Sequence, residues 1–305
     1  MGVIAAACDY VYVMKDGKMI ENGCADDIFY NPQTEYTKKL LSDATAEQLL
    51  VKEKVFAAQE NPLFTVRHLK KRFQNEEGVN DVSFDICEGE VFALAGESGS
   101  GKTTLAKILT GLEQPDSGEV FCRGERVDRK NRKRNKNMHG KVRMIFQDPY
   151  SSLNPCMTIN EMLTETLRAK EKQIKFDQKE RKKDRQRQIE QMLTRVGLSS
   201  LDGKRYPREL SGGQRQKAAI ARALLLEPEL LICDEAVSSL DAATRTQILD
   251  LLLRVVKEKK IACLFISHDM ALIRRISHRT GVLYKGTLAE CAKTRDLCRD
   301  PWHPY

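Results

Sequence analysis

Short apolar runs alternate with amphipathic segments along most of the chain. Largely apolar runs occur at 91–95, 142–146, 230–233 and 262–266. Such continuous runs are typical of strands that are buried on both faces of a parallel sheet. Segments 102–112 and 242–256 instead carry apolar residues at helical spacing. Strands that alternate with helices predict the α/β class with a parallel sheet.

Composition and charge narrow the class of protein. With 305 residues, 41% hydrophobic and 31% charged, the chain has the balance of a globular protein, and no apolar run approaches 18 residues. Nine cysteines without a C-x-x-C pair indicate thiols in a reducing cytosol rather than a zinc site.

A net charge of +8 suits an anionic partner such as a nucleotide, a nucleic acid or a lipid surface. The basic stretch at 123–143 contains no Phe, Tyr or Trp and that at 168–187 contains only Phe176, so neither has the repeated alternation of aromatic residues and cations that a base-stacking surface would have. We therefore expect solvated loops and helix faces there, and no nucleic-acid partner.

A phosphate-binding loop follows the first apolar run. The pattern G-x-x-x-x-G-K-[ST] stands between a predicted strand and a predicted helix, where backbone N–H groups and the helix N-terminus can bind an anion. In this loop we expect Lys102 to contact the β- and γ-phosphates and the Thr103 hydroxyl to bind Mg²⁺. The loop residues are Gly96, Glu97, Ser98, Gly99, Ser100, Gly101, Lys102 and Thr103.

Two adjacent carboxylates end the apolar run at 230–233. A single carboxylate there could simply cap a helix, but two in a phosphate-binding fold suggest separate roles. Asp234 would hold the Mg²⁺ shell, and Glu235 would orient and deprotonate the attacking water. About twenty residues earlier, Ser211, Gly212, Gly213 and Gln214 precede an amphipathic helix and form a second anion-ready helix start.

Together these motifs resemble those of the nucleotide-binding subunits of ATP-binding cassette (ABC) transporters, over essentially the whole chain. The resemblance implies a P-loop ABC ATPase fold with an antiparallel β layer near 62–95 and an inserted helical subdomain. It also implies ATP and Mg²⁺ as ligands and two domains that clamp two ATP molecules, each site pairing one phosphate loop with the other domain's signature, 210–214. Further residues that match the family are Gln147 (Q-loop, catalysis and metal), 238–241 (D-loop), His268 (switch histidine at the γ-phosphate), Phe73 (adenine stacking) and Thr104 beside the loop.

The segment 146–155 and the Asn-Pro…Tyr tails at 31–41 and 300–305 are similar to those of peptide and nickel importers. This likeness implies ATP hydrolysis that drives a membrane importer for oligopeptides, dipeptides or nickel, with permease partners, at the cytoplasmic face of the membrane. A non-transport tandem ATPase, such as a metalloenzyme activator, remains an alternative. Ala236-Val237 and Ala292 depart from the family pattern but touch no catalytic atom.

The chain also repeats itself at a period of 269 residues. Val13, Gly17, Glu21, Asp27, Pro32 and Tyr36 align without gaps on Val282, Gly286, Glu290, Asp296, Pro301 and Tyr305. We therefore expect 1–41 to be the C-terminal remnant of a preceding cassette, 42–61 a helical linker, and 62–305 a cassette with its helical subdomain at about 147–209 and a truncated tail. On this hypothesis the chain is a piece of a two-cassette protein. Residues 1 to about 40 would then lack the sheet that they were built to cover, and we expect their apolar positions to be partly exposed or covered by another surface. These positions are Val11, Val13, Ile20, Ile28 and Phe29.

Overall fold

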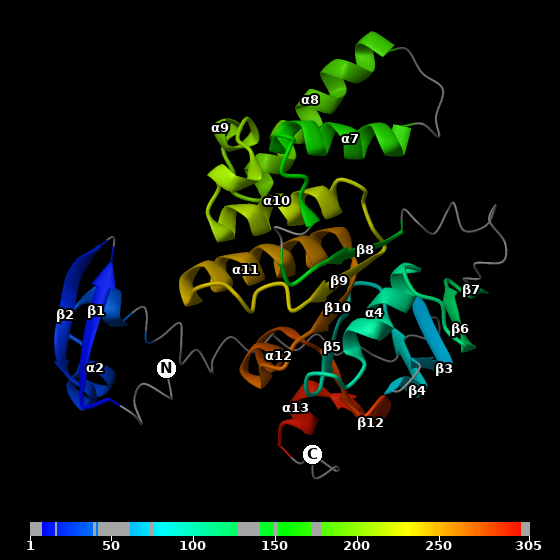
Figure 1. Ribbon diagram of the computed structural model, residues 1–305, viewed down its shortest axis with the longest axis horizontal. Coiled ribbons are helices and arrows are strands. Elements are labelled where there is room, and N and C mark those ends of the chain that lie inside the picture. The colour runs from blue at the N-terminus through cyan, green and yellow to red at the C-terminus, as the bar shows by residue number, and fades with distance from the viewer. Residues whose placement is uncertain are drawn as a thin grey trace.

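The computed structural model describes residues 8–15, 17–38, 41, 62–73, 76–126, 141–148, 152–171 and 178–299. Figure 1 shows two larger sheets and most helices gathered in one body, with a two-stranded hairpin near the N-terminus apart from it. The predicted linker at 42–61, most of the first basic stretch, at 127–140, and the tail at 300–305 lie outside the described residues.

The central sheet has six strands in the order β12-β11-β5-β10-β9-β8. Five strands are parallel, and β12 is antiparallel at one edge. All residues of β5, β9 and β10 are buried, which explains their continuous apolar sequences and confirms the strands predicted from them. The bounds are β5 (Val91–Ala95), β8 (Val142–Ile145), β9 (Leu230–Asp234), β10 (Ala262–Ile266), β11 (Arg279–Tyr284) and β12 (Thr287–Lys293).

The two faces of this sheet are covered by different elements. Alternate side chains along a strand point to opposite faces, so Cys233 and Ile232 enter separate cores. The face with Cys233 packs on α10 (Gly212–Leu224) and α11 (Ala242–Lys259). The face with Ile232 packs on α4 (Lys102–Thr110) and on the second sheet. Helices α4 and α10 therefore lie on opposite faces of the central sheet.

Local signals account for the helix boundaries. α4 ends two residues before the predicted end because Gly111 adopts a left-handed conformation, with φ of 76°. α11 begins where the Asp241 side chain accepts a hydrogen bond from the Thr244 N–H. It continues past the predicted end to Lys260, which has φ of 52°.

The second sheet is antiparallel, with strand order β4-β3-β6-β7. The expected antiparallel layer near 62–95 is therefore present as β3 and β4, and β6 and β7 extend it, while 91–95 lies in the central sheet as its continuous apolar sequence predicted. Val66, Leu69 and Val82 are buried beneath it with Leu105 of α4. The strand bounds are β3 (Phe64–Phe73), β4 (Glu76–Ile86), β6 (Ser117–Cys122) and β7 (Glu125–Arg126).

A helical layer covers α10 on the side away from the sheet (Figure 1). Its buried side chains, including Ile159, Leu163 and Leu193, pack in the same core as α10. The inserted helical subdomain is thus present. It consists of α7 (Ile159–Glu171), α8 (Gln178–Arg195), α9 (Ser200–Gly203) and the 3-10 turn η1 (Pro207–Glu209).

Two short helices complete the central sheet beside β11. Ile273 and Leu297 pack with Ala93 and Val282 in a small third core. The helices are α12 (Met270–Ile276) and α13 (Thr294–Leu297), and the separate N-terminal hairpin consists of β1 (Tyr10–Lys15), β2 (Lys18–Cys24) and α2 (Ala25–Tyr30).

Candidate nucleotide-binding site

The carboxyl ends of four neighbouring parallel strands meet at one edge of the central sheet. Register pairs Leu94 of β5 with Ile266 of β10, and Ile266 with Asp234 of β9. β8 extends the same edge, with Ile145 opposite Cys233. The residues that follow these strands include most of the predicted site, so the topology brings together segments that are up to about 170 residues apart.

The phosphate loop lies between β5 and α4 and uses three glycines in left-handed conformations. Gly96, Gly99 and Gly101 have φ of 148°, 82° and 101°. A Cβ on Gly96 would meet the carbonyl oxygen of Leu283, and one on Gly101 would meet that of Gly78. Glycine is therefore required at Gly96 and Gly101 by both backbone conformation and space.

Lys102, the first residue of α4, points its ammonium group into the loop. Its Nζ donates to the carbonyl oxygens of Gly96 and Glu97 at 2.8 and 2.5 Å and to Ser100 Oγ at 3.2 Å. Burial lowers the pKa of this ammonium, while the carboxylates of Glu235, Asp234 and Glu97 act in the opposite direction. The cation is thus held at the centre of the loop by carbonyl oxygens and by the field of nearby carboxylates.

The rest of the predicted loop lies around this cation. Ser100 is buried, and its N–H donates to the Glu97 carbonyl at 3.2 Å. Glu97, Ser98 and Gly99 are exposed on the outside of the loop. Thr104 is half-buried in the first turn of α4.

Two of the three residues expected to bind magnesium, Thr103 and Asp234, lie next to each other. The Thr103 hydroxyl is close enough to the Asp234 carboxylate to lower its pKa. Burial raises the pKa of Asp234, with only partial compensation from Thr103 and from the cations Lys102 and Lys107. Adjacent hydroxyl and carboxylate oxygens next to a phosphate loop are the donor set that suits Mg²⁺.

Glu235 and His268 form a second polar pair at the same edge. Glu235 Oε1 lies 3.1 Å from His268 Nδ1. Glu235 has φ of 47°, an unusual conformation for a glutamate, and its N–H donates to the Ile266 carbonyl at 3.0 Å. The side chain of Glu235 is 22% exposed and that of His268 62%, so water reaches this pair.

Gln147 follows β8 and is exposed, two residues past the strand. Its position after β8 places it at the same edge as Asp234, because β8 and β9 are paired in parallel. No hydrogen bond links it to Thr103 or Asp234 among the contacts of the described residues.

Phe73 ends β3 and is 46% exposed. Its ring lies against Gly78, where an added Cβ would be 2.7 Å from Phe73 Cε2. The carbonyl of Gly78 in turn packs on Gly101 of the phosphate loop. The exposed Phe73 ring is therefore separated from the phosphate loop only by the backbone at Gly78.

The signature residues lie on the other face of the sheet from α4. Ser211 caps α10: its Oγ accepts from the Gln214 N–H at 3.3 Å, and its own N–H donates to Gln214 Oε1 at 3.0 Å. Gly212 and Gly213 form the first turn, and an added Cβ on Gly213 would meet Thr244 of α11. The structure thus does not bring Ser211 to the phosphate loop of its own chain.

The sequence did not point to two supports of the loop. Gly286, in the turn between β11 and β12, donates from its N–H to the Ser100 carbonyl at 3.1 Å and accepts from the Asn80 N–H at 2.7 Å. The second support is Gly78, whose carbonyl oxygen packs against Gly101 of the loop. The Gly286 contacts join residues about 190 to 210 positions apart, and no local sequence signal reveals them.

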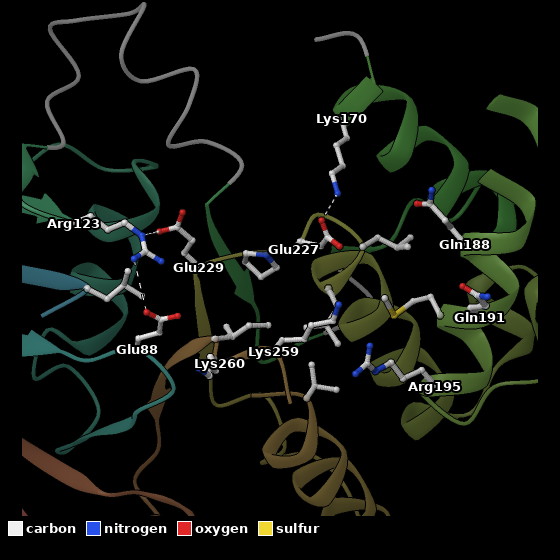
Figure 2. Close-up of a pocket in the computed structure, with 17 residues that line it drawn as sticks. Glu88, Arg123, Lys170, Gln188, Gln191, Arg195, Glu227, Glu229, Lys259 and Lys260 are labelled. Atoms are coloured by element: carbon white, nitrogen blue, oxygen red, sulfur yellow. Dashed lines mark hydrogen bonds and ion pairs between the residues drawn. The ribbon is translucent and has the colours of Figure 1, made fainter. Parts of the chain in front are cut away.

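A cavity of about 550 Å³ lies elsewhere, where β9 and β10 begin (Figure 2). The predicted site residues do not line it. Much of its charge is paired: Arg123 donates to Glu229 at 3.0 Å, and Lys170 to Glu227 at 2.8 Å. The candidate nucleotide site lies at the opposite, carboxyl edge of the sheet.

Solved structures of ABC cassettes have the same fold. A dimeric structure of MJ0796, a bacterial ABC transporter cassette, has a TM-score of 0.68 and 26% identity, over 76% of this chain and 99% of that one. CbiO1 from Clostridium perfringens, part of the ABC transporter complex cbiONQ, has a TM-score of 0.69 over 79% of this chain and 92% of that one. At 23% identity it bears on the fold alone.

Sequence comparison extends this likeness to the whole chain. The glutathione import ATP-binding protein GsiA of Escherichia coli (strain K12) is 38% identical over 338 aligned positions, which cover all of this chain and 53% of GsiA. The chain thus spans about half the length of the curated relatives it matches. The profile of the family described as ABC transporter matches residues 79–238, from β4 through the phosphate loop to the residues after Glu235, and the chain belongs to that family.

Proposed function

We propose that the chain binds ATP and hydrolyses it to drive a membrane importer. The observation that carries the proposal is the convergence at one sheet edge of the Lys102 loop, the Thr103–Asp234 contact and the Glu235–His268 pair. Each of these does a different part of phosphoryl transfer to water: binding the phosphates, holding a cation and activating the water.

Binding relies on the loop. The Lys102 ammonium, already directed into the loop, would exchange its carbonyl partners for β- and γ-phosphate oxygens, and the N–H groups at the start of α4 would face the same anion. Mg²⁺, when bound, would neutralise charge on the phosphates, and Thr103, Asp234 and Gln147 are the residues that we propose to hold it.

Hydrolysis relies on the polar pair. Glu235 would orient the attacking water and take its proton as the water oxygen bonds to the γ-phosphorus and the bond to ADP breaks. His268, hydrogen-bonded to Glu235, would hold that carboxylate in place and contact the γ-phosphate. The half-exposed position of this pair leaves it accessible to both water and nucleotide.

Phe73 provides a prediction about the base. Phe73→Ala is expected to weaken ATP binding by about 5- to 150-fold, because stacking of a base on an aromatic ring contributes about 1–3 kcal/mol. Phe73→Trp retains a ring and should bind ATP about as well as the unchanged chain. Calorimetric titration with inorganic tripolyphosphate, which has no base, provides the matched ligand control. If Phe73→Ala weakens tripolyphosphate binding as much as ATP binding, the ring supports the loop and does not stack on adenine.

The position of Ser211 supports a second cassette as partner. Because α10 and α4 lie on opposite faces of the sheet, we propose that Ser211, Gly212, Gly213 and Gln214 contact ATP held by another cassette's phosphate loop. The dimeric MJ0796 cassette is a precedent for such pairing.

Mixing two inactive variants tests this arrangement. Lys102→Ala and Ser211→Ala chains that form homodimers should each hydrolyse ATP poorly. Mixed dimers should regain activity, because a dimer with one chain of each variant contains one intact composite site. The rate is measured before and after mixing, and dimer composition is checked by native mass spectrometry. The control mixes two separately tagged Lys102→Ala preparations. Verified mixed dimers without recovered activity would show that Ser211 acts within its own chain.

The importer and its solute class rest on GsiA, whose name describes a glutathione import ATP-binding protein. We propose permease subunits as membrane partners, short peptides as the transported class, and a location at the inner face of the membrane. Among the described residues no helix is long and apolar enough to cross a membrane.

Uptake and purification together test the importer. A strain without the chain should lose uptake of radiolabelled short peptides, and wild-type chain but not Glu235→Gln should restore it. The tagged chain purified from membranes should carry integral membrane subunits. Unchanged uptake, with recovery of a soluble metalloenzyme instead of permeases, would favour a non-transport ATPase.

A further inference from the structure

The same β-hairpin and helix occur twice in this chain. β1, β2 and α2 begin 269 residues before β11, β12 and α13, and each strand has the same length in both copies. Tyr10 pairs with Cys24 as Arg279 pairs with Lys293. The register shifts at the same place in both, after Val13 and after Val282.

The two turns also match. Gly17 has φ of 76° and Gly286 has φ of 81°. Since register, bulge and turn agree, the C-terminal copy shows what surrounds this hairpin when it is part of a cassette.

In the C-terminal copy the hairpin is covered on one edge and one face. β11 pairs in parallel with β5, Val282 lying opposite Ala95. Leu283 is fully buried in the core between the two sheets, where its cross-strand partner Leu288 packs beside it. The turn is hydrogen-bonded to the phosphate loop through Gly286 and Ser100.

In the N-terminal copy the equivalent face is exposed. Met14 and Met19, the counterparts of Leu283 and Leu288, are 60% and 57% exposed, and Tyr12 is 59% exposed. Tyr10 lies beside Tyr12, with ring centroids 5.2 Å apart. We call Tyr10, Tyr12, Met14 and Met19 the aromatic face.

The opposite face of the N-terminal copy is closed by its own helix. Val13 and Ile28 are 6% and 4% exposed, as their counterparts Val282 and Leu297 are 9% and 6% exposed. Of the two expected alternatives, exposure or cover by another surface, Val13 and Ile28 show the second, because α2, which carries Ile28, packs on β1 and β2. Ile20 is exposed as expected, at 37%, while Val11 and Phe29 are half-buried.

Further hydrogen bonds show that the hairpin is organised without the central sheet. The Glu21 carboxylate accepts hydrogen bonds from the N–H groups of Gln33 and Thr34 and from the Thr34 hydroxyl. These bonds lower the pKa of Glu21 to about 2. The unit is thus a formed hairpin whose aromatic face and β1 edge have no cover within the described part of the chain.

We propose that β1 pairs in parallel with the strand that precedes the phosphate loop of a second ABC cassette, and that the aromatic face enters that cassette's core. The inference rests on the second cassette of the proposed function. The β5 of this chain cannot be the partner, since β10 and β11 occupy both of its edges, and the same holds in another copy. The partner is therefore a cassette in which the strand before the phosphate loop has a free edge, at the position where β11 pairs with β5 in this chain.

This pairing would make the hairpin part of the partner's nucleotide site. By the equivalence with Gly286, the Gly17 N–H would donate to the partner's phosphate loop, as Gly286 donates to Ser100. The first segment of this chain would thus support the loop in which the other cassette holds ATP.

The residue at position 12 restricts the sequence of the partner strand. Tyr12 takes the place of Gly281, where an added Cβ would lie 2.9 Å from Leu288 Cδ1, in the position that Met19 takes in the N-terminal copy, and 3.2 Å from Phe92 Cζ. A tyrosine there has room only if the partner strand carries a small residue where this chain has Phe92. The partner therefore resembles β5 but is not identical to it.

Photo-crosslinking in the native cell tests the proposal on the full chain. Tyr10, whose counterpart Arg279 lies opposite Phe92, is replaced by benzoylphenylalanine, and crosslinked peptides are identified by mass spectrometry. The expected product is a strand directly followed by a glycine-rich phosphate loop, with a small residue at the Phe92 position. Crosslinks only to lipid, to a permease, to other segments of this chain or to nothing would overturn the proposal.

Two further variants complete the experiment. Adding Met14→Lys should reduce the crosslink at least about 10-fold, since it would bury an unpaired charge in the partner, while leaving this chain folded because Met14 is exposed. Benzoylphenylalanine in place of the exposed Lys257 on α11 is the control and should not reach that strand. The crosslink does not require ATP hydrolysis, so the two proposals can fail separately. If the mixture of Lys102→Ala and Ser211→Ala chains regains activity but the crosslink is absent, the docking of the hairpin is refuted and the composite site is not. If the crosslink forms but the mixture stays inactive, the composite site is refuted and the docking is not.

Discussion

Glu235→Gln is expected to bind Mg·ATP but to turn it over at least about 100-fold more slowly, since a positioned general base contributes about 10²–10⁴-fold. Glutamine has nearly the same shape and can still accept a hydrogen bond from His268, at the present 3.1 Å separation from Nδ1. It cannot take a proton from water. Single-turnover hydrolysis of radiolabelled ATP, together with nucleotide titration, separates the chemical step from binding.

The control for Glu235→Gln removes a carboxylate elsewhere. Glu119 on β6 pairs with Arg126 at the edge of the antiparallel sheet, and Glu119→Gln should leave the rate unchanged. A near-normal rate for Glu235→Gln would mean that Glu235 only maintains the turn after β9. A lost rate together with lost ATP binding would mean that the substitution distorts the loop, since the unusual φ of 47° leaves little tolerance there.

Lys102→Ala is expected to weaken ATP binding by at least about 10-fold, because a hydrogen bond to a charged group contributes about 1.5–3 kcal/mol and each 1.4 kcal/mol is tenfold. Lys102 is the only side-chain cation within the loop sequence at 96–103. The loop should keep its shape, since the backbone bonds from Ser100 to Glu97 and from Gly286 to Ser100 remain. Titration with a fluorescent ATP analogue measures the loss, and circular dichroism checks the fold.

Two companion variants sharpen the Lys102 test. Lys257→Ala removes an exposed cation from the end of α11 and should bind ATP normally. Lys102→Arg keeps the charge but places a larger planar group among the carbonyls of Gly96 and Glu97. The ATP affinity of Lys102→Arg should therefore lie between that of the unchanged chain and that of Lys102→Ala. Unchanged affinity in Lys102→Ala would refute the phosphate-loop assignment.

Features that depend on neighbours in the chain were predictable. The phosphate loop is a contiguous pattern between a strand and a helix, and the structure has all three where they were expected. The buried strands β5, β9 and β10 were evident because both of their faces are covered, which requires continuous apolar residues. The magnesium roles of Thr103 and Asp234 followed from two separate motifs, the phosphate loop and the paired carboxylates, and not from their spacing of 131 residues.

Features that depend on strand pairing were not predictable from local patterns. The sequence predicted that 91–95 is a buried strand of a parallel sheet but not that its neighbours are β10 and β11, because hydrogen-bond partners in a sheet are chosen across the whole chain. The support of the phosphate loop by Gly78 and Gly286 depends in the same way on distant strands that meet.

The two copies of the hairpin show most clearly where sequence ends and tertiary structure begins. Local alternation and turn residues determine the hairpin itself, so the same register, bulge and glycine turn form twice. Whether its apolar face is buried depends on a neighbouring strand: Leu283 is fully buried and Met14 is 60% exposed at equivalent positions. A side chain's chemistry makes burial favourable, but only contact with another surface removes that side chain from water, and this contact is a property of the assembled fold.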